Sequence, residues 1–266
     1  MTEKPQHQKS MPFKKNRRLH RKGKKDATVF LLKVAVILLA AVLIVTGIYK
    51  HGAKRSDTAI VVALDAAHDS DAYGMQGLIN EGEFTGKVID AIEAELKKDP
   101  HFAVIRTHAA DQEASVKRRV EAVNVVKPDI LISIACDGSS MDAEKKGTVI
   151  YADIPSKKSN ADSLKFASIM QECFKEAGIE APIDYYYYKP IGNDVFQPHI
   201  VDSSDTTDYQ EDTFAILQKT VCPAIVIRQI YVTNASDVDT WANQDGYAKL
   251  AGIYVSALQR MYKDNR

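Results

Sequence analysis

The sequence predicts a single α/β domain with a mostly parallel, twisted sheet flanked by helices on both faces, preceded by one transmembrane helix. Three observations support this prediction. A long apolar segment lies near the N-terminus, apolar strand-like runs alternate with amphipathic helical segments after residue 58, and polar residues gather where the strand-like runs end. Alternation of strands and helices along a chain is typical of sheets with helices on both faces.

Residues 27–49 are predicted to form the transmembrane helix, as a signal anchor. These 23 residues carry one charge, Lys33, near the start. At ~1.5 Å per residue they reach ~34 Å, which is enough to cross a hydrocarbon core of ~30 Å. A cleaved signal peptide is the main alternative. The long basic region before the segment and the lack of a clear small-x-small site after it favour the anchor.

The charge distribution predicts which side of the membrane each part occupies. The chain has 35 basic and 35 acidic residues, yet residues 1–26 alone carry ten Lys or Arg against two acids, while residues 51–266 are net acidic. Basic segments beside a membrane helix stay in the cytoplasm. We therefore predict a basic cytoplasmic tail over 1–26 and an extracytoplasmic domain on a single-pass cell-membrane protein. Topology and contact with anionic lipid explain the tail more simply than a nucleic-acid partner does.

After a polar linker over 50–57, residues 58–266 are predicted to form the domain. Strands are expected at 59–65, 102–107, 129–136, 147–153 and 223–231. Helices are expected at 81–98, 113–127, 159–177, 209–220, 236–241 and 245–263. The helix over 236–241 is expected to take Ser236 as its cap. Residues 179–209 contain three prolines and few helical signals, and they are predicted to form a long loop.

Polar residues follow three of the predicted strands. The first strand ends in Asp65-Ala66-Ala67-His68-Asp69, and the third ends in Ser133-Ile134-Ala135-Cys136-Asp137. The fifth contains Arg228, and Glu81 opens the first helix of the domain. Sites in open α/β sheets form at the carboxyl ends of the strands, so these residues are expected to lie close together.

The order and spacing of these strings resemble the zinc-dependent N-acetylmuramoyl-L-alanine amidase family, whose members cleave peptidoglycan. The resemblance covers residues 58–262 and rests on VVALDAAHD, GLINEGEFTGKVIDAI, ILISIACDG, GTVIYAD and TFAILQKTVCPAIVIRQIYVTN. It implies an α/β fold, a cell-wall ligand, and a zinc ion held by two histidines and a glutamate. A second glutamate, on the last strand, would act on the zinc-bound water.

Carried over position by position, the resemblance gives an incomplete metal site. His68 matches the first histidine and Glu81 matches the glutamate ligand. The second histidine falls on Ala135, which has no donor atom, and the catalytic glutamate falls on Arg228. Arginine stays protonated and cannot act as a base. The sequence therefore resembles a divergent family member with a degenerate active site.

Two interpretations of the remaining residues stay open. Asp137 faces the same way as Ala135 by strand alternation and could substitute as a ligand, and His108 and His199 are also available. Alternatively, His68 pairs with an acid as a structural histidine. An ion pair between Arg228 and Glu81 or Asp65 would occupy the place of the family's metal ion. Such an ion pair would therefore indicate that metal binding has been lost.

Other residues give weaker signals. Cys136, Cys173 and Cys222 are an odd number of cysteines and form no disulfide framework, and a parallel sheet would place Cys136 and Cys222 at opposite ends. Tyr185 to Tyr188, with Phe196, could form an aromatic platform for sugar rings or could simply pack half-inward. The acidic stretch 202–212 is interpreted as a solvated surface.

Three functions are consistent with these residues. The first is an amidase-fold protein that lacks hydrolysis and binds peptidoglycan or cell-wall fragments, or regulates cell-wall enzymes. The second is an active zinc-dependent N-acetylmuramoyl-L-alanine amidase with a substitute ligand set, and the third is a purely structural envelope protein.

Overall fold

The computed structural model describes residues 59–67, 74–109, 114–192 and 195–263. The predicted tail, transmembrane helix and linker lie outside these residues. No helix within the described ranges has the length and apolar character needed to cross a membrane.

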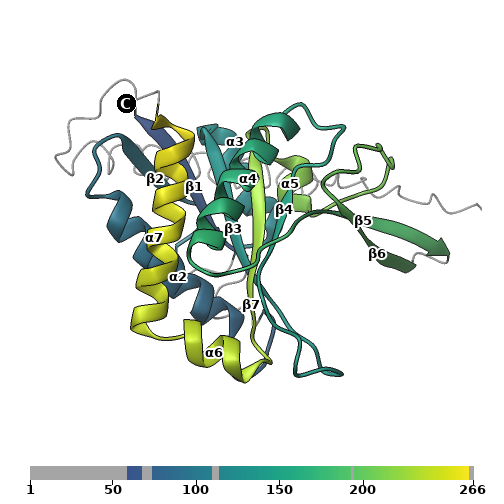
Figure 1. The fold of residues 1–266 in the computed structure, drawn as a ribbon. Helices are drawn as coiled ribbons and strands as arrows, with labels where there is room; N and C mark the ends of the chain where they lie inside the picture. Colours follow the sequence, from purple (N-terminus) through teal and green to yellow (C-terminus); the bar gives the residue numbers. More distant parts are fainter. Residues whose placement is uncertain (1–58, 68–73, 110–113, 193–194, 264–266) are drawn as a thin grey trace, which may run out of the picture. The chain divides into compact units, whose positions relative to one another are not determined.

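The described residues form one α/β domain around a seven-stranded sheet in the order β2-β1-β3-β7-β4-β5-β6 (Figure 1). The strands are β1 (Ile60–Ala66), β2 (Phe102–Arg106), β3 (Ile130–Asp137), β4 (Val149–Ala152), β5 (Ile183–Gly192), β6 (Val195–Asp202) and β7 (Ala224–Tyr231). The helices are α2 (Glu81–Leu96), α3 (Val116–Val126), α4 (Asn160–Glu176), α5 (Ala215–Lys219), α6 (Ala235–Trp241) and α7 (Gln244–Met261).

The sheet is mixed. β2, β1, β3 and β7 run parallel to one another, whereas β4 pairs antiparallel with β7. β5 is parallel to β4, and β6 returns antiparallel to β5. The predicted mostly parallel sheet is thus confirmed for the half that carries β1, β3 and β7. The other half departs from it because β4 enters the sheet in the opposite direction.

Helices cover both faces of the sheet, as predicted. The main core lies between the sheet and helices α2, α4 and α7, where side chains such as Leu64, Ile132, Phe84 and Tyr254 are almost fully buried. Figure 1 shows α2 and α7 lying along each other on this side. Because strand residues alternate between faces, Asp65, Ser133, Ala135 and Arg228 lie on the opposite face, where α3 and α5 pack.

The predicted loop over 179–209 is wrong, because residues 183–192 and 195–202 form the paired strands of the β5–β6 hairpin. Figure 1 shows this hairpin extending away from the helical layers. Tyr185 and Tyr187 are fully buried toward the main core, whereas Tyr186 and Tyr188 face the other side. Tyrosine fits both environments, so four tyrosines in a row hide the alternation that usually reveals a strand.

Two other boundaries differ from the prediction. The helix expected at 209–220 is shorter than predicted and consists of α5 alone. The residues before α5 are extended and run beside β5, where the Tyr188 amide donates to the Asp212 carbonyl at 2.7 Å. Helix α6 is capped by Asn234 rather than Ser236, and the Asn234 side chain accepts from the Asp237 amide at 3.0 Å.

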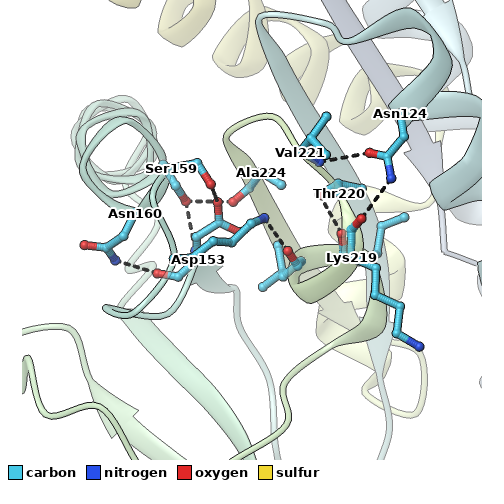
Figure 2. A network of polar contacts seen from close by, with 12 residues as sticks. Asn124, Asp153, Ser159, Asn160, Lys219, Thr220, Val221 and Ala224 are labelled. Atoms are coloured by element: carbon cyan, nitrogen blue, oxygen red, sulfur yellow. Dashed lines mark hydrogen bonds and ion pairs between the residues drawn. The ribbon is translucent and has the colours of Figure 1, made fainter. Parts of the chain in front are cut away.

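A polar network fastens α5 to the sheet (Figure 2). Asp153, which is fully buried just after β4, accepts from the Ser159 hydroxyl at 2.6 Å and from the Lys157 ammonium at 2.9 Å. The same ammonium donates to the Leu217 carbonyl in α5. Burial raises the pKa of Asp153, and the contacts with Lys157 and Ser159 oppose this rise. The network thus joins the end of β4 to α5.

Helix α3 holds the segment that follows α5. The Asn124 side chain donates to the Lys219 carbonyl and accepts from the Val221 amide, both at 2.9 Å (Figure 2). These two bonds satisfy backbone groups at the end of α5 that the helix itself leaves unpaired. Phe214, immediately before α5, is therefore held over the sheet face that carries Arg228.

Candidate functional site

The candidate site lies at the carboxyl ends of β1, β3 and β7, where the sequence predicted it. Ala135 of β3 pairs in register with Arg228 of β7, which in turn pairs with Val149 of β4. The amidase resemblance placed the second histidine and the catalytic glutamate at Ala135 and Arg228, so these two positions are direct neighbours. His68 lies outside the described residues.

Glu81 is held at the start of α2 by its surroundings. Asn80 caps the helix by accepting from the Glu83 amide at 3.1 Å. The preceding turn packs tightly on the end of β7, where a Cβ on Gly77 would stand 2.3 Å from the Val232 carbonyl oxygen. This close approach requires glycine and brings Glu81 against the end of β3.

The Glu81 carboxylate is buried and bonded to the backbone. One oxygen accepts from the Cys136 amide at 2.6 Å, and the other accepts from the Met75 amide, also at 2.6 Å. The residue is 3% exposed. Short bonds from amides to an ionised oxygen are among the stronger hydrogen bonds in proteins. Glu81 therefore joins α2, the turn before it and the end of β3.

Arg228 forms its ion pair with Asp137 rather than with Glu81 or Asp65. Its Nη1 donates to Asp137 Oδ2 at 2.9 Å, and the Gly138 amide donates to Asp137 Oδ1, also at 2.9 Å. The β3–β7 pairing ends in a bulge at this contact. Ala135 pairs with Arg228, but two residues further along β3, Asp137 pairs with Tyr231. The proposed substitute ligand is thus engaged with a cation.

Three aromatic rings surround the Arg228 guanidinium. Its central carbon lies 5.8 Å from the Tyr151 ring and 5.6 Å from the rings of Tyr186 and Phe214. Tyr186 and Phe214 stack at 4.4 Å. Cation–π attraction at these distances adds to the ion pair. We call Tyr151, Tyr186 and Phe214 the aromatic box.

The charge at this position is fixed. Burial acts to lower the pKa of Arg228, but Asp137 and the tyrosines outweigh it and raise the pKa overall. Burial also raises the pKa of Tyr151, so its phenol stays neutral. The position that the resemblance assigns to a general base therefore holds a permanent cation.

Asp65, at the end of β1, is bound within a second polar cluster. Its carboxylate accepts from Arg119 at 2.6 Å, from the Thr107 hydroxyl at 2.6 Å and from the Ser133 hydroxyl at 2.7 Å. Asp65 is fully buried and the Arg119 side chain is 6% exposed. This cluster ties α3 to three strands, and the sequence did not predict it, because no pattern along the chain places Arg119 opposite Asp65.

Among the other residues singled out in the sequence, Tyr186 belongs to the aromatic box, whereas His108 and His199 contact residues outside it. His108 lies 2.9 Å from the Thr107 hydroxyl and lines a cavity of about 210 Å³ beside α2. His199 lies on β6, 3.5 Å from Glu211. Cys136, Cys173 and Cys222 are free and buried. Burial, with Glu81 and Asp137 nearby, raises the pKa of Cys136 well above its usual range, so its thiol is a poor nucleophile.

These donors do not fit a zinc ion in the described part of the site. No three His, Cys, Asp or Glu side chains converge there within reach of one metal. Ala135 has no donor, Asp137 is bonded to a guanidinium, and Glu81 accepts two amide bonds. Zinc sites in proteins require three or four nitrogen, sulfur or oxygen ligands around an accessible position.

Comparison with known proteins identifies the family. The sequence profile of the N-acetylmuramoyl-L-alanine amidases matches residues 62–260, and the chain belongs to this family. A curated relative, the probable N-acetylmuramoyl-L-alanine amidase AmiB of Haemophilus influenzae, is 33% identical over 95 residues. That match covers 35% of this chain and only 22% of the relative's length.

Solved amidase structures share the fold at low sequence identity. The catalytic domain of CwlV from Bacillus (Paenibacillus) polymyxa var. colistinus has a TM-score of 0.60 at 23% identity, covering 78% of this chain and 99% of that one. An amidase from Clostridium difficile 630 has a TM-score of 0.62 at 17% identity, with coverage of 78% and 98%. The CwlD amidase of Clostridioides difficile, solved in complex with the GerS lipoprotein, has a TM-score of 0.56 at 15% identity, covering 77% and 99%.

Proposed function

We propose that this protein is a membrane-anchored, extracytoplasmic member of the amidase family that binds peptidoglycan or regulates cell-wall enzymes without hydrolysing the MurNAc–L-Ala amide bond. The apolar segment over 27–49 and the basic tail before it support the anchor and its orientation. Membership of the amidase family supports a cell-wall ligand.

The observation that carries the proposal is the environment of Arg228. Hydrolysis in this family requires a carboxylate on the last strand to take a proton from water. Here that strand position holds a guanidinium, fixed by Asp137 and the aromatic box. A fixed cation cannot accept a proton, and it repels a second cation at the same place.

The active-enzyme alternative depends on Asp137 as a substitute ligand. In the structure this carboxylate accepts from Arg228 and from the Gly138 amide, one bond on each oxygen. Recruiting it to a metal would leave the largely buried guanidinium without its anion. The general-base position would still be vacant, so the geometry favours binding over hydrolysis.

A partner protein is part of the proposal. The solved CwlD amidase is in complex with the GerS lipoprotein, so one protein with this fold assembles with another protein. By analogy, the domain of this chain could act through a bound cell-wall enzyme.

The decisive experiment measures binding and hydrolysis on the same sample. Full-length protein in mild detergent is incubated with purified insoluble peptidoglycan, with and without added Zn²⁺. Co-sedimentation reports binding, and chromatography of the soluble fraction reports released stem peptides. We expect co-sedimentation without release, and no bound zinc by elemental analysis.

An Asp137→Asn variant separates the alternatives. If Asp137 is a substitute ligand, the wild type releases peptides with zinc and the variant does not. Such zinc-dependent release by the wild type would overturn the proposal. An absence of both binding and release, with the protein folded, would instead support a purely structural role.

A further inference from the structure

The outer part of the β5–β6 hairpin presents an apolar face next to the candidate site. Residues directly opposite each other in an antiparallel pair share a face of the sheet. The pairs Tyr188–Pro198 and Pro190–Phe196 continue from the pair formed by Tyr186 and Ile200. We call the outer residues of this face the hairpin ledge: Tyr188, Pro190, Phe196, Pro198 and Ile200.

The ledge is open to solvent. Phe196 is 53% exposed and Ile200 is 52% exposed, and both prolines are exposed. Figure 1 shows the hairpin reaching beyond the helices. Aromatic, proline and aliphatic side chains thus gather on one exposed face of the hairpin, where a ligand can reach them.

The ledge is continuous with the environment of Arg228. The Tyr188 ring meets the Tyr186 ring at 5.0 Å, and Tyr186 belongs to the aromatic box. A row of apolar groups therefore runs from the candidate site outward along the hairpin. The charged residues of this face lie toward its inner end, where Asp184 pairs with Asp202 and Asp212 pairs with Tyr188. Lys189 and Gln197 lie on the opposite face of the hairpin.

The size of the ledge selects the kind of ligand. Three cross-strand pairs spaced by two residues span roughly 14 Å, and two strands with their side chains are roughly 10 Å wide. The area is on the order of 150 Å², far below the ~800 Å² that each partner contributes to a standard protein interface. A narrow chain ligand fits these dimensions better than a folded partner or a second copy does.

The prolines argue against strand addition at this edge. A partner strand would need backbone N–H donors from β6, and Pro198 lacks one. Proline on an edge strand is a common device that prevents such pairing. The ledge is therefore suited to a ligand that lies across its face.

We propose that the hairpin ledge binds the uncharged sugar rings of a peptidoglycan glycan strand, whose inner end reaches Arg228. Sugar rings have apolar C–H faces that pack against flat aromatic and proline rings. This inference rests on the proposed function and names the part of peptidoglycan that the hairpin contacts.

The test is a binding titration of the full-length protein in detergent. The probes are peptide-free glycan strands and a soluble N-acetylglucosamine oligomer, with binding followed by calorimetry. The double variant Tyr188→Ala/Phe196→Ala should weaken binding of the glycan strands at least tenfold. Phe196→Trp should retain or strengthen it, because the flat ring is kept.

Variants on the opposite face of the hairpin serve as matched controls. Lys189→Ala and Gln197→Ala should leave the affinity within twofold of the wild type, and circular dichroism checks that all variants are folded. If the wild type and the double variant bind intact peptidoglycan equally, the ledge inference is overturned while the proposed function stands. The ledge inference is also overturned if the wild type binds intact peptidoglycan but does not bind peptide-free glycan strands. Absence of all peptidoglycan binding would defeat both.

Discussion

The two sides of the candidate site hold their charges in different ways. On the β1 side, the Asp65 and Glu81 carboxylates are nearly inaccessible and are bonded to hydroxyls, to Arg119 and to backbone amides. On the β7 side, the side chains of Arg228 and Asp137 are 25% and 22% exposed, and aromatic rings frame the cation.

This difference separates buried carboxylates that hold elements of the domain together from charged side chains that reach the surface. Glu81 matches a family metal ligand, yet its contacts bind together α2, the turn before it and β3. These contacts give Glu81 a structural role in the domain. On the β7 side, the position that the resemblance assigns to the general base holds a partly exposed cation next to the hairpin ledge.

The largest expected effect tests whether the β1 side is structural. Asp65→Ala leaves the Arg119 guanidinium buried without its anion, which typically costs about 3–5 kcal/mol in the free energy of unfolding. Urea denaturation followed by circular dichroism measures it. The control is Asp90→Ala, whose carboxylate is 54% exposed and pairs with Arg106, and which should cost less than about 1 kcal/mol. Equal losses in the two variants would contradict a structural role for the Asp65 cluster.

The second prediction concerns Glu81. Glu81→Ala leaves the amides of Met75 and Cys136 without this acceptor, and we expect a loss of about 2–4 kcal/mol in the free energy of unfolding. Glu81→Gln keeps one acceptor oxygen and should lose less. Both are measured by urea denaturation with and without a zinc chelator.

The chelator distinguishes a structural carboxylate from a metal ligand. If Glu81 acts through its backbone bonds, the chelator leaves the wild type and both variants unchanged. A wild type that loses stability in the chelator, by as much as Glu81→Ala does, would show that Glu81 acts through a bound metal.

Much of this fold could be predicted from the sequence, because β1, β3 and β7 are continuous apolar runs and α2 and α7 have clear helical periodicity. The hairpin could not, because its tyrosines suit either face and its prolines resemble loop signals. The reversed direction of β4 could not be predicted either, since a short apolar strand has the same pattern in both directions.

The site was only partly predictable. Alignment to the family motif matched Ala135 and Arg228 to the second histidine and the catalytic glutamate, and the strand register makes these two residues direct neighbours. The aromatic box was not foreseen because Tyr151, Tyr186 and Phe214 come from three separate elements, brought together only by the strand order. The sequence suggested Asp137 as a substitute metal ligand. It could not show the ion pair of Asp137 with Arg228, because a bulge that the sequence does not reveal accompanies this contact.

The smallest expected effect concerns the ion pair on the β7 side. Arg228→Met keeps an unbranched apolar stem and removes the charge, whereas Asp137→Asn keeps the shape of its partner. We expect each variant to cost about 1–2 kcal/mol in the free energy of unfolding, with a coupling energy of about 0.5–1 kcal/mol in a double-mutant cycle. The exposed pair of Arg260 and Glu176, with side chains 42% and 60% exposed, provides the control cycle.

The cycle decides what holds Arg228 in place. We expect the coupling energy of the Arg260–Glu176 control pair to lie near the low end of the range for surface ion pairs, because water screens both charges. A larger value for Arg228 and Asp137 means that the carboxylate fixes the guanidinium, as the 2.9 Å contact indicates. If the two couplings are equal, the aromatic box alone positions the cation, and Phe214→Leu rather than Asp137→Asn should then release it. Asp137 would in that case be available to a ligand. The aromatic rings, and not the ion pair, would then distinguish the β7 side of the site from the β1 side.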